Sequence, residues 1–155
     1  MSSRNIYDLH PQLQPLAQAF VQRCEAAGLD ILITTTYRSP SEQDHLYTLG
    51  RTVRSHVGPW NARYPFGRVV TRAQGGQSEH NYTLNGAPAA LAFDFVPLVG
   101  GKPVWDEKAP QWQQAGQIAM DLGLKWYGAP GSPFKEFPHI AHKESKQIMA
   151  GLLQV

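Results

Sequence analysis

The stretch "LAFDFVP", residues 91–97, alternates its side chains in the manner of a β-strand and carries one acid. Successive side chains of a strand point to opposite faces, so Phe93 and Phe95 share one face and Asp94 lies on the other. The pattern predicts a buried strand. Asp94 shares its face with small and branched apolar side chains, those of Ala92 and Val96.

Four other segments predict helices, from apolar periodicity or from terminal signals. Ser39, Pro40 and Glu42 match the N-cap, the first helical position and the capping-box acid of the second of them. The four segments are 13–27, 40–49, 110–122 and a terminal stretch from Lys143 that includes Ile148, Leu152 and Leu153.

Two further segments, 31–37 ("ILITTTY") and 124–127 ("LKWY"), predict strands. Residues 51–77 hold glycines, prolines, arginines and aromatics without a sustained period, which predicts a long surface excursion with a short strand at 68–71. The strands are too few and too irregularly spaced for a doubly wound sheet. We therefore expect an α+β fold in which residues 1–155 form a single domain, with helices packed on a small, mainly antiparallel sheet.

The composition excludes several classes of protein. The longest apolar runs fall far short of the ~20 residues of a membrane helix. The N-terminus lacks the apolar core of a secretory signal, so we expect synthesis in a cytoplasm. Cys24 is the single cysteine and is expected to be a buried thiol. The net charge is only +2, and the arginines between Arg51 and Arg72 do not form a dense basic stripe, so we expect no nucleic-acid partner.

Two clusters of histidine and carboxylate residues offer ligands for a metal. "SEHNY" (78–82) places His80 before Asp94, and "EFPHIAH" (136–142) joins Glu136 to two more histidines. A His, Asp, His set with a bound water is an open tetrahedral zinc site, in which the metal lowers the pKa of water to roughly 7 and polarises a carbonyl. Such a site needs a further carboxylate as general base, and Glu136 is the candidate.

The residues alone leave an ordinary alternative open. His80 can lie in a polar loop, Asp94 can be satisfied by a backbone donor, and both C-terminal histidines can lie on the surface. Along a flat strand, His139 and His142 point to opposite faces, so only one of them can reach a metal. The same geometry separates Glu136 from His139 unless the chain bends at the Phe-Pro pair between them.

Four tryptophan and tyrosine residues differ in their sequence context. Trp112 and Trp126 fit core periodicities and are expected to pack in the interior. Trp60 and Tyr64 lie in the arginine-rich excursion and are candidates for contact with a sugar or a peptide.

Three separated blocks resemble the zinc D-alanyl-D-alanine carboxypeptidase and L-alanyl-D-glutamate endopeptidase family, which includes VanY-like enzymes, cell-wall peptidases and phage endolysins. The blocks are "TTYRSPSEQDHLYTLGR" (35–51), "SEHNY" with "LAFDF" (78–95) and "KEFPHI" (135–140). Their order and rough distances agree with the family, as does the layout of helix 110–122 followed by "GLKWYG". The resemblance spans the chain from about Leu13 to His142 and implies a Hedgehog/DD-peptidase-like fold.

The resemblance also implies a role for particular residues. The implied zinc ligands are His80, Asp94 and His139, with Glu136 as general base and His142 outside the ligand set. Arg38 is similar to an arginine that holds the substrate carbonyl or the developing oxyanion. Gln43 and Ser78 match positions close to the substrate.

The chain departs from the family pattern in two places. Thirteen residues separate His80 from Asp94, more than the family usually has, and we interpret "TLNGAPAA" (83–90) as a hairpin-like insertion with turn residues at its tip. The base is a glutamate, Glu136, where many relatives have an aspartate. The carboxylate is kept and its reach is one methylene longer.

The resemblance implies a zinc metallopeptidase that cleaves the stem peptide of bacterial peptidoglycan. We expect the L-Ala–D-Glu bond, with removal of a terminal D-Ala by a D,D-carboxypeptidase as the close alternative. A zinc-containing module without hydrolytic activity, of the Hedgehog type, and a metal-free wall-binding domain are alternatives of another class. We expect a bacteriolytic phage endolysin that acts as a monomer on the cell wall, in the periplasm, after holin-dependent release from the host cytoplasm.

Overall fold

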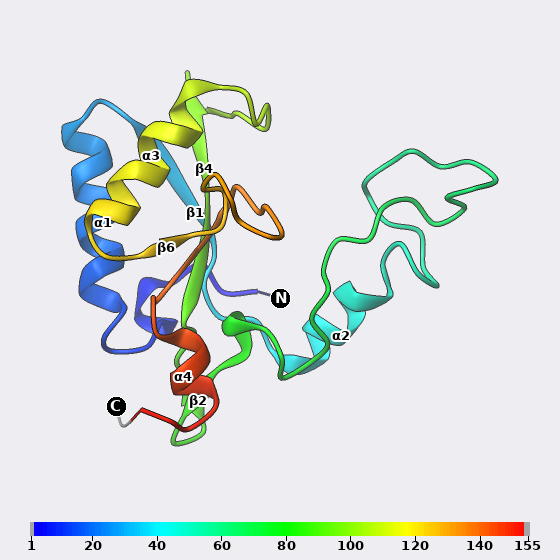
Figure 1. Ribbon diagram of the computed structural model, residues 1–155, viewed down its shortest axis with the longest axis horizontal. Coiled ribbons are helices and arrows are strands. Elements are labelled where there is room, and N and C mark those ends of the chain that lie inside the picture. The colour runs from blue at the N-terminus through cyan, green and yellow to red at the C-terminus, as the bar shows by residue number, and fades with distance from the viewer. Residues whose placement is uncertain (1, 154–155) are drawn as a thin grey trace.

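One antiparallel sheet forms the frame of the molecule (Figure 1). The computed structural model of the chain describes residues 2–153. The strands of the sheet are β1 (Asp30–Thr35), β4 (Ala92–Val99), β5 (Lys102–Pro103), β6 (Lys125–Trp126) and β7 (His139–Ala141). The central strand, β4, lies between β1 and β7, while β5 pairs with the end of β4 and β6 pairs with β7. Every pair is antiparallel, as expected.

Two helices, α1 (Gln14–Ala26) and α3 (Pro110–Asp121), cover one face of this sheet (Figure 1). Phe20 of α1 packs with its ring centroid 5.6 Å from that of Phe93 and 5.3 Å from that of Phe95. Trp112 of α3 lies 5.2 Å from Phe95. The aromatic face of β4 is therefore buried under the helices, and Asp94 points to the other face of the sheet.

The expected α+β class and the expected positions of the helices at 13–27, 40–49 and 110–122 are confirmed. Ser39 caps α2 (Pro40–Thr48), because its hydroxyl accepts a hydrogen bond from the Glu42 amide at 3.2 Å. Cys24 is fully buried in α1, as expected. The remaining helical elements are α4 (Ser145–Met149) and the short 3-10 helices η1 (Ile6–Asp8) and η2 (Glu79–Asn81).

Two expectations were wrong. Residues 68–71 form no strand, because the Arg68 amide donates to the Val57 carbonyl at 2.8 Å within a compact loop instead of joining a ladder. The terminal helix ends at Met149 and excludes the two leucines expected in it. Gly151 adopts a positive φ of 73°, and the Leu152 amide donates to the Gln147 carbonyl at 2.8 Å, which is the Schellman arrangement that stops a helix.

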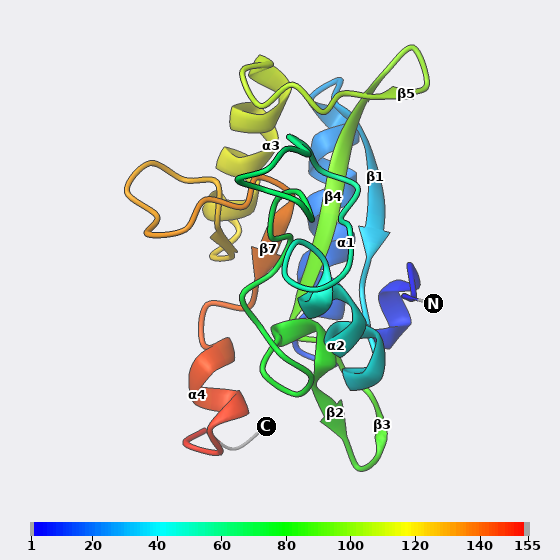
Figure 2. The same cartoon turned by 90° about the vertical axis from the view of Figure 1, so that its right-hand side faces the viewer.

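The insertion at 83–90 is a hairpin, as expected, formed by β2 (Thr83–Leu84) and β3 (Ala87–Pro88). Asn85 and Gly86 have φ values of 54° and 79°, the left-handed pair that a two-residue hairpin turn requires. Figure 2 shows the hairpin projecting from one end of the molecule. The Leu91 amide donates to the Glu79 carbonyl at 2.9 Å and closes its base, so the inserted residues leave the chain ends beside each other.

Trp126 links the helical layer to the strand that follows it in the sheet, β7. Its ring packs against Gly116 of α3, where an added Cβ would lie 2.2 Å from the indole. Its Nε1 donates to the Phe137 carbonyl at 2.8 Å, two residues before His139. Both Trp112 and Trp126 are buried, which confirms their expected place in the core. Within residues 2–153, no helix has both the length and the apolar character needed to cross a membrane.

We expect Gly116→Ala to lower the free energy of unfolding by about 1–3 kcal/mol, because the new methyl group overlaps the Trp126 ring and the core must shift to admit it. Urea denaturation followed by tryptophan fluorescence measures the change. Gln113→Ala, on the exposed face of the same helix, is the control and should change stability by less than about 0.5 kcal/mol. Equal effects of the two substitutions would contradict the packing argument.

Candidate metal centre

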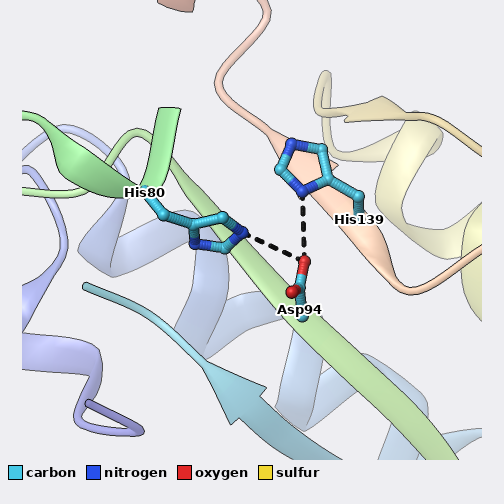
Figure 3. A group of neighbouring side chains, drawn as sticks. All are labelled: His80, Asp94 and His139. Carbon is cyan, nitrogen blue, oxygen red and sulfur yellow. Dashed lines mark hydrogen bonds and ion pairs between the residues drawn. The ribbon is translucent and has the colours of Figure 1, made fainter. Parts of the chain in front are cut away.

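Three side chains, those of His80, Asp94 and His139, meet on the face of the sheet opposite α1 and α3 (Figure 3). Asp94 of β4 and His139 of β7 are register partners on adjacent antiparallel strands, so both point to the same face. His80 reaches them from η2. Asp94 Oδ1 lies 3.2 Å from His80 Nε2 and 3.1 Å from His139 Nδ1, and one ligand atom from each residue lies within 4.8 Å of the others. The structure thus brings together the three residues that the sequence singled out.

His80 is held in one orientation by the backbone. Its Nδ1 lies 2.7 Å from the carbonyl oxygen of the buried Thr36, and a carbonyl only accepts, so Nδ1 carries the proton. The Ser78 hydroxyl accepts from the His80 amide at 3.2 Å, and the Arg38 amide donates to the His80 carbonyl at 2.9 Å. Nε2 of His80 therefore carries the lone pair that is free to bind a metal, and this nitrogen faces Asp94.

A buried acid, Glu79, orients His139. Its Oε1 lies 2.8 Å from His139 Nε2 and accepts a hydrogen bond from the Tyr127 hydroxyl at 2.9 Å, while the Ser145 hydroxyl donates to Oε2. Because Nε2 of His139 donates to this carboxylate, Nδ1 is left to face Asp94. An imidazole hydrogen-bonded to a carboxylate is the arrangement typical of metal-ligating histidines.

Sequence reasoning overlooked Glu79. It sits in the "SEH" segment, one residue before a candidate ligand, and that adjacency was the only signal of its role. Its three partners lie 48 to 66 residues away in the chain, so no local pattern could indicate them.

The cluster concentrates negative charge in a buried place. Burial opposes ionisation of Asp94, but His80 and His139 outweigh it and hold the pKa of this carboxyl well below its usual range. Burial also opposes ionisation of Glu79, and the bond from His139 outweighs it, so the pKa is lowered to about 2. Conversely, burial would lower the pKa of His139, but its bonds to Asp94 and Glu79 raise it to about 10. Two ionised carboxylates beside two imidazoles favour a bound cation, which would replace the proton that His139 otherwise carries.

Glu136 lies beside the cluster without joining it. The chain turns at Phe137-Pro138, where the His139 amide donates to the Glu136 carbonyl at 3.1 Å, and this is the bend that the sequence required. Glu136 Oε2 lies 3.9 Å from His139 Nδ1. Burial outweighs the attraction of His139 and raises the pKa of Glu136. A carboxyl with a raised pKa next to metal ligands can both take up and return a proton.

The other three residues expected in the site, Arg38, Ser78 and Gln43, differ in their access to it. Arg38 and Ser78 line a cleft of about 570 Å³ that contains the cluster, a volume usual for ligand sites. Gln43 is buried beneath it and does not line the cleft: its Oε1 accepts from Arg38 Nη1 at 3.0 Å, and its Nε2 donates to the Ala73 carbonyl at 2.9 Å. His142 lies outside the cluster, with Nδ1 accepting from the Glu144 amide at 3.1 Å.

An open His, Asp, His cluster with an additional carboxylate beside it could hold a metal ion in the way that hydrolytic zinc sites do, which is compatible with a peptidase. The chain is 34% identical over 141 residues to the peptidoglycan L-alanyl-D-glutamate endopeptidase CwlK of Bacillus subtilis (strain 168), a match that covers 86% of this chain and 72% of that protein. The chain belongs to this peptidoglycan endopeptidase family. No family model matches it.

Two solved structures share the fold. The L-Ala D-Glu endopeptidase ChiX of Serratia marcescens superposes with a TM-score of 0.61 at 15% identity, over 94% of this chain and 91% of that one. The LD-carboxypeptidase LdcB superposes with a TM-score of 0.57 at 16% identity, over 94% of this chain and 65% of that one. These matches confirm the expected DD-peptidase-like architecture.

We expect His139→Ala to abolish stoichiometric zinc binding, because it removes one of three ligand atoms, whereas His142→Ala should largely keep it. Isothermal titration of the metal-free protein with zinc measures both, and circular dichroism checks that each variant is folded. Retention of zinc by His139→Ala together with its loss from His142→Ala would overturn the ligand assignment.

We expect Glu79→Gln to weaken zinc binding by about 10-fold and Glu79→Ala by about 100-fold, because the first removes the charge behind His139 and the second also removes the hydrogen bond. Competition with a zinc chelator measures the affinity, and the absorption spectrum of the cobalt-substituted protein reports the ligand geometry. Glu25→Gln, an exposed acid on α1, is the control and should change neither quantity.

Proposed function

We propose that the chain is a zinc-dependent endopeptidase that hydrolyses the bond between L-Ala and D-Glu in the stem peptide of peptidoglycan. Hydrolysis of the stem peptide follows from its family. The observation that carries the proposal is the cluster of His80, Asp94 and His139 in the wall of an open cleft, with the Glu136 carboxylate 3.9 Å from His139.

The donor set suits zinc. Two imidazole nitrogens and one carboxylate oxygen are ligands that zinc accepts, and three protein ligands leave the fourth tetrahedral position for water or substrate. Zinc held by these residues would supply a Lewis acid that lowers the pKa of a water molecule and polarises the scissile carbonyl. The hydrogen bonds from His80 to Thr36 and from His139 to Glu79 keep the ligating nitrogens aimed at one point.

Glu136 moves the proton. As the water oxygen attacks the carbonyl carbon, the Glu136 carboxylate accepts the proton that the water loses. The protonated carboxyl then donates this proton to the amine nitrogen of D-Glu as the C–N bond breaks. The raised pKa of Glu136 suits both halves of this cycle, since it makes the carboxylate a stronger base than an exposed glutamate.

Arg38 binds the carbonyl oxygen on which negative charge develops. Its Nη1 is held by Gln43 and its Nε donates to Ser2 at 3.3 Å, which fixes the guanidinium at the edge of the cleft. The remaining N–H groups can then donate to the oxyanion without reorganisation. In this proposal Gln43 acts on the substrate only through Arg38, and Ser78 acts by capping the η2 turn that carries His80.

A D,D-carboxypeptidase is the second candidate. Arg72 and Lys146 also line the cleft, and either cation could pair with the free carboxylate that ends a stem peptide. The α-carboxylate of D-Glu offers the same charge to an endopeptidase. The two candidates therefore differ in their products and not in the cations that they require.

We further propose that residues 1–155 act as one monomeric catalytic unit of the endolysin type, reaching the wall of the host cell after release by a holin. One buried core, which joins α1, α3 and the sheet, supports the single-unit part of this proposal, since strands of that sheet carry Asp94 and His139.

We expect Glu136→Gln to reduce hydrolysis of purified peptidoglycan by about 10²–10⁴-fold, because the amide cannot take up the proton of the attacking water. Mass spectrometry of the new amino termini identifies the bond: a freed D-Glu amine supports the endopeptidase, and released D-Ala supports the carboxypeptidase. Zinc content should be unchanged in the variant, and a chelator should abolish wild-type activity. Undiminished hydrolysis by Glu136→Gln would remove the proposed base, and absence of any product from the zinc-loaded wild type would favour a non-catalytic binding module.

A further inference from the structure

Residues 51–77, which we call the arm, project from the body of the molecule on the side away from α1 and α3 (Figure 1). The arm contains five arginines and no aspartate or glutamate, so its charge of +5 exceeds the net +2 of the whole chain. A segment whose charges are all positive and lie this close together attracts an anionic partner. Of these arginines, the proposed function uses only Arg72, which lines the cleft.

Most of this charge has no acidic partner among the residues that the structure describes. Arg51 is used internally, since its Nη1 donates to the Tyr47 and Thr71 carbonyls and so fastens the base of the arm to α2. Across residues 2–153, no carboxylate forms an ion pair with the other four arginines. They are Arg54, Arg63, Arg68 and Arg72, and all four are exposed.

The arm also exposes a set of large apolar side chains. Trp60 and Tyr64 are 45% and 41% exposed, with the guanidinium of Arg54 4.7 Å from the Trp60 ring and that of Arg63 5.2 Å from the Tyr64 ring. Val53, Phe66 and Val69 are exposed to a similar degree. A groove of about 400 Å³ runs between Tyr64, Pro59, Arg68 and Val69. Aromatic rings beside guanidinium groups suit a ligand that combines apolar ring faces with anionic groups.

This surface has a defined shape, although it contains no helix or strand. The Ser55 amide donates to the Phe66 carbonyl at 2.8 Å, and the Trp60 indole donates to the Ser55 carbonyl at 3.1 Å. At Gly67 the φ is +77°, and a Cβ there would lie 2.5 Å from the Val57 carbonyl oxygen, so the two limbs of the arm meet more closely than a side chain would allow. Hydrogen bonds within the arm thus preorganise the groove.

The arm is continuous with the cleft of the metal cluster. His56 and Arg72, from the two limbs of the arm, line that cleft together with His80 and Glu136. The Arg72 guanidinium also lies 4.0 Å from the centroid of the Phe134 ring, in the loop that precedes Glu136. Figure 2, which looks onto this side, shows the arm in front of the sheet. A polymer with its peptide in the cleft therefore meets the arm.

We propose that the arm binds the peptidoglycan polymer next to the scissile bond, with sugar rings in the groove at Tyr64 and on the exposed Trp60, and neighbouring stem-peptide carboxylates on Arg54, Arg63 and Arg68; this rests on the proposed function. In peptidoglycan, L-Ala is attached directly to the muramic acid sugar. At about 3.5 Å per extended residue, the sugar lies within about 10 Å of a bond cut after L-Ala. A glycan strand held there would raise the local concentration of stem peptides at the cleft.

The test compares polymeric and small substrates. The arm variant is Arg54→Gln, Arg63→Gln, Arg68→Gln and Tyr64→Ala combined, and the control variant carries Arg4→Gln, Arg23→Gln and Lys102→Gln, which remove the same charge from exposed positions on the body. Each is combined with Glu136→Gln for co-sedimentation with purified sacculi, so that the polymer is not digested. Each is also assayed with Glu136 intact on sacculi and on a soluble stem peptide without sugar.

We expect the arm variant to bind sacculi about tenfold more weakly than the control and to hydrolyse them about tenfold more slowly, with the rate on the soluble stem peptide unchanged. Equal loss in arm and control variants, or equal loss on both substrates, would overturn the proposal. So would binding of the wild type to phosphatidylglycerol vesicles, but not to sacculi, that depends on the arm. Failure of the wild type to hydrolyse the soluble peptide would count against the proposed function alone, because sedimentation still measures the arm.

Discussion

The pairing of Asp94 with His139 across β4 and β7 is the constraint on which the rest of the site depends. Backbone register sets these two side chains on one face of the sheet, where Asp94 Oδ1 lies 3.1 Å from His139 Nδ1. A slip of one residue would turn one of them into the core. The buried aromatic face of β4 prevents such a slip, since Phe93 and Phe95 would have to leave the contact with Phe20. Packing of the aromatic residues on one face of the sheet therefore keeps Asp94 and His139 in register on the other face.

The histidines gain their directions from groups outside the cluster. Thr36 belongs to the segment that leaves β1, and Glu79 is bonded to Tyr127 and to Ser145 at the start of α4. Distant parts of the chain thus converge to determine which nitrogen of each ring faces Asp94. This explains why a small domain devotes a buried acid, Glu79, to orienting a histidine.

Sequence patterns predicted the parts of the structure that local chemistry determines. The alternation around Asp94, the cap at Ser39 and the turn at Asn85-Gly86 each depend on residues close in the chain, and all three are confirmed. The candidate metal ligands were inferred from the resemblance of three separated motifs, in their order along the chain, to a known family. Glu79 could not be found in this way, because its role exists only after β7 and α4 have folded against η2. The prediction of a strand at 68–71 was wrong for a related reason. The composition there is typical of a strand, but the Arg68 amide donates to the carbonyl of a loop residue, Val57, and not to a neighbouring strand.

The hairpin at 83–90 adds residues between His80 and Asp94 without moving these two side chains apart. Its base is closed by the Leu91–Glu79 backbone bond, and the neighbouring bond from the Ala89 amide to the Tyr82 carbonyl, at 3.0 Å, forms a second rung. The residues beyond these two hydrogen bonds project into solvent, and the chain then returns to the base of the hairpin. The turn is therefore suited to protein engineering: a short affinity tag or a wall-targeting peptide inserted at Asn85-Gly86 would be carried at one end of the molecule without changing the distance in space between His80 and Asp94.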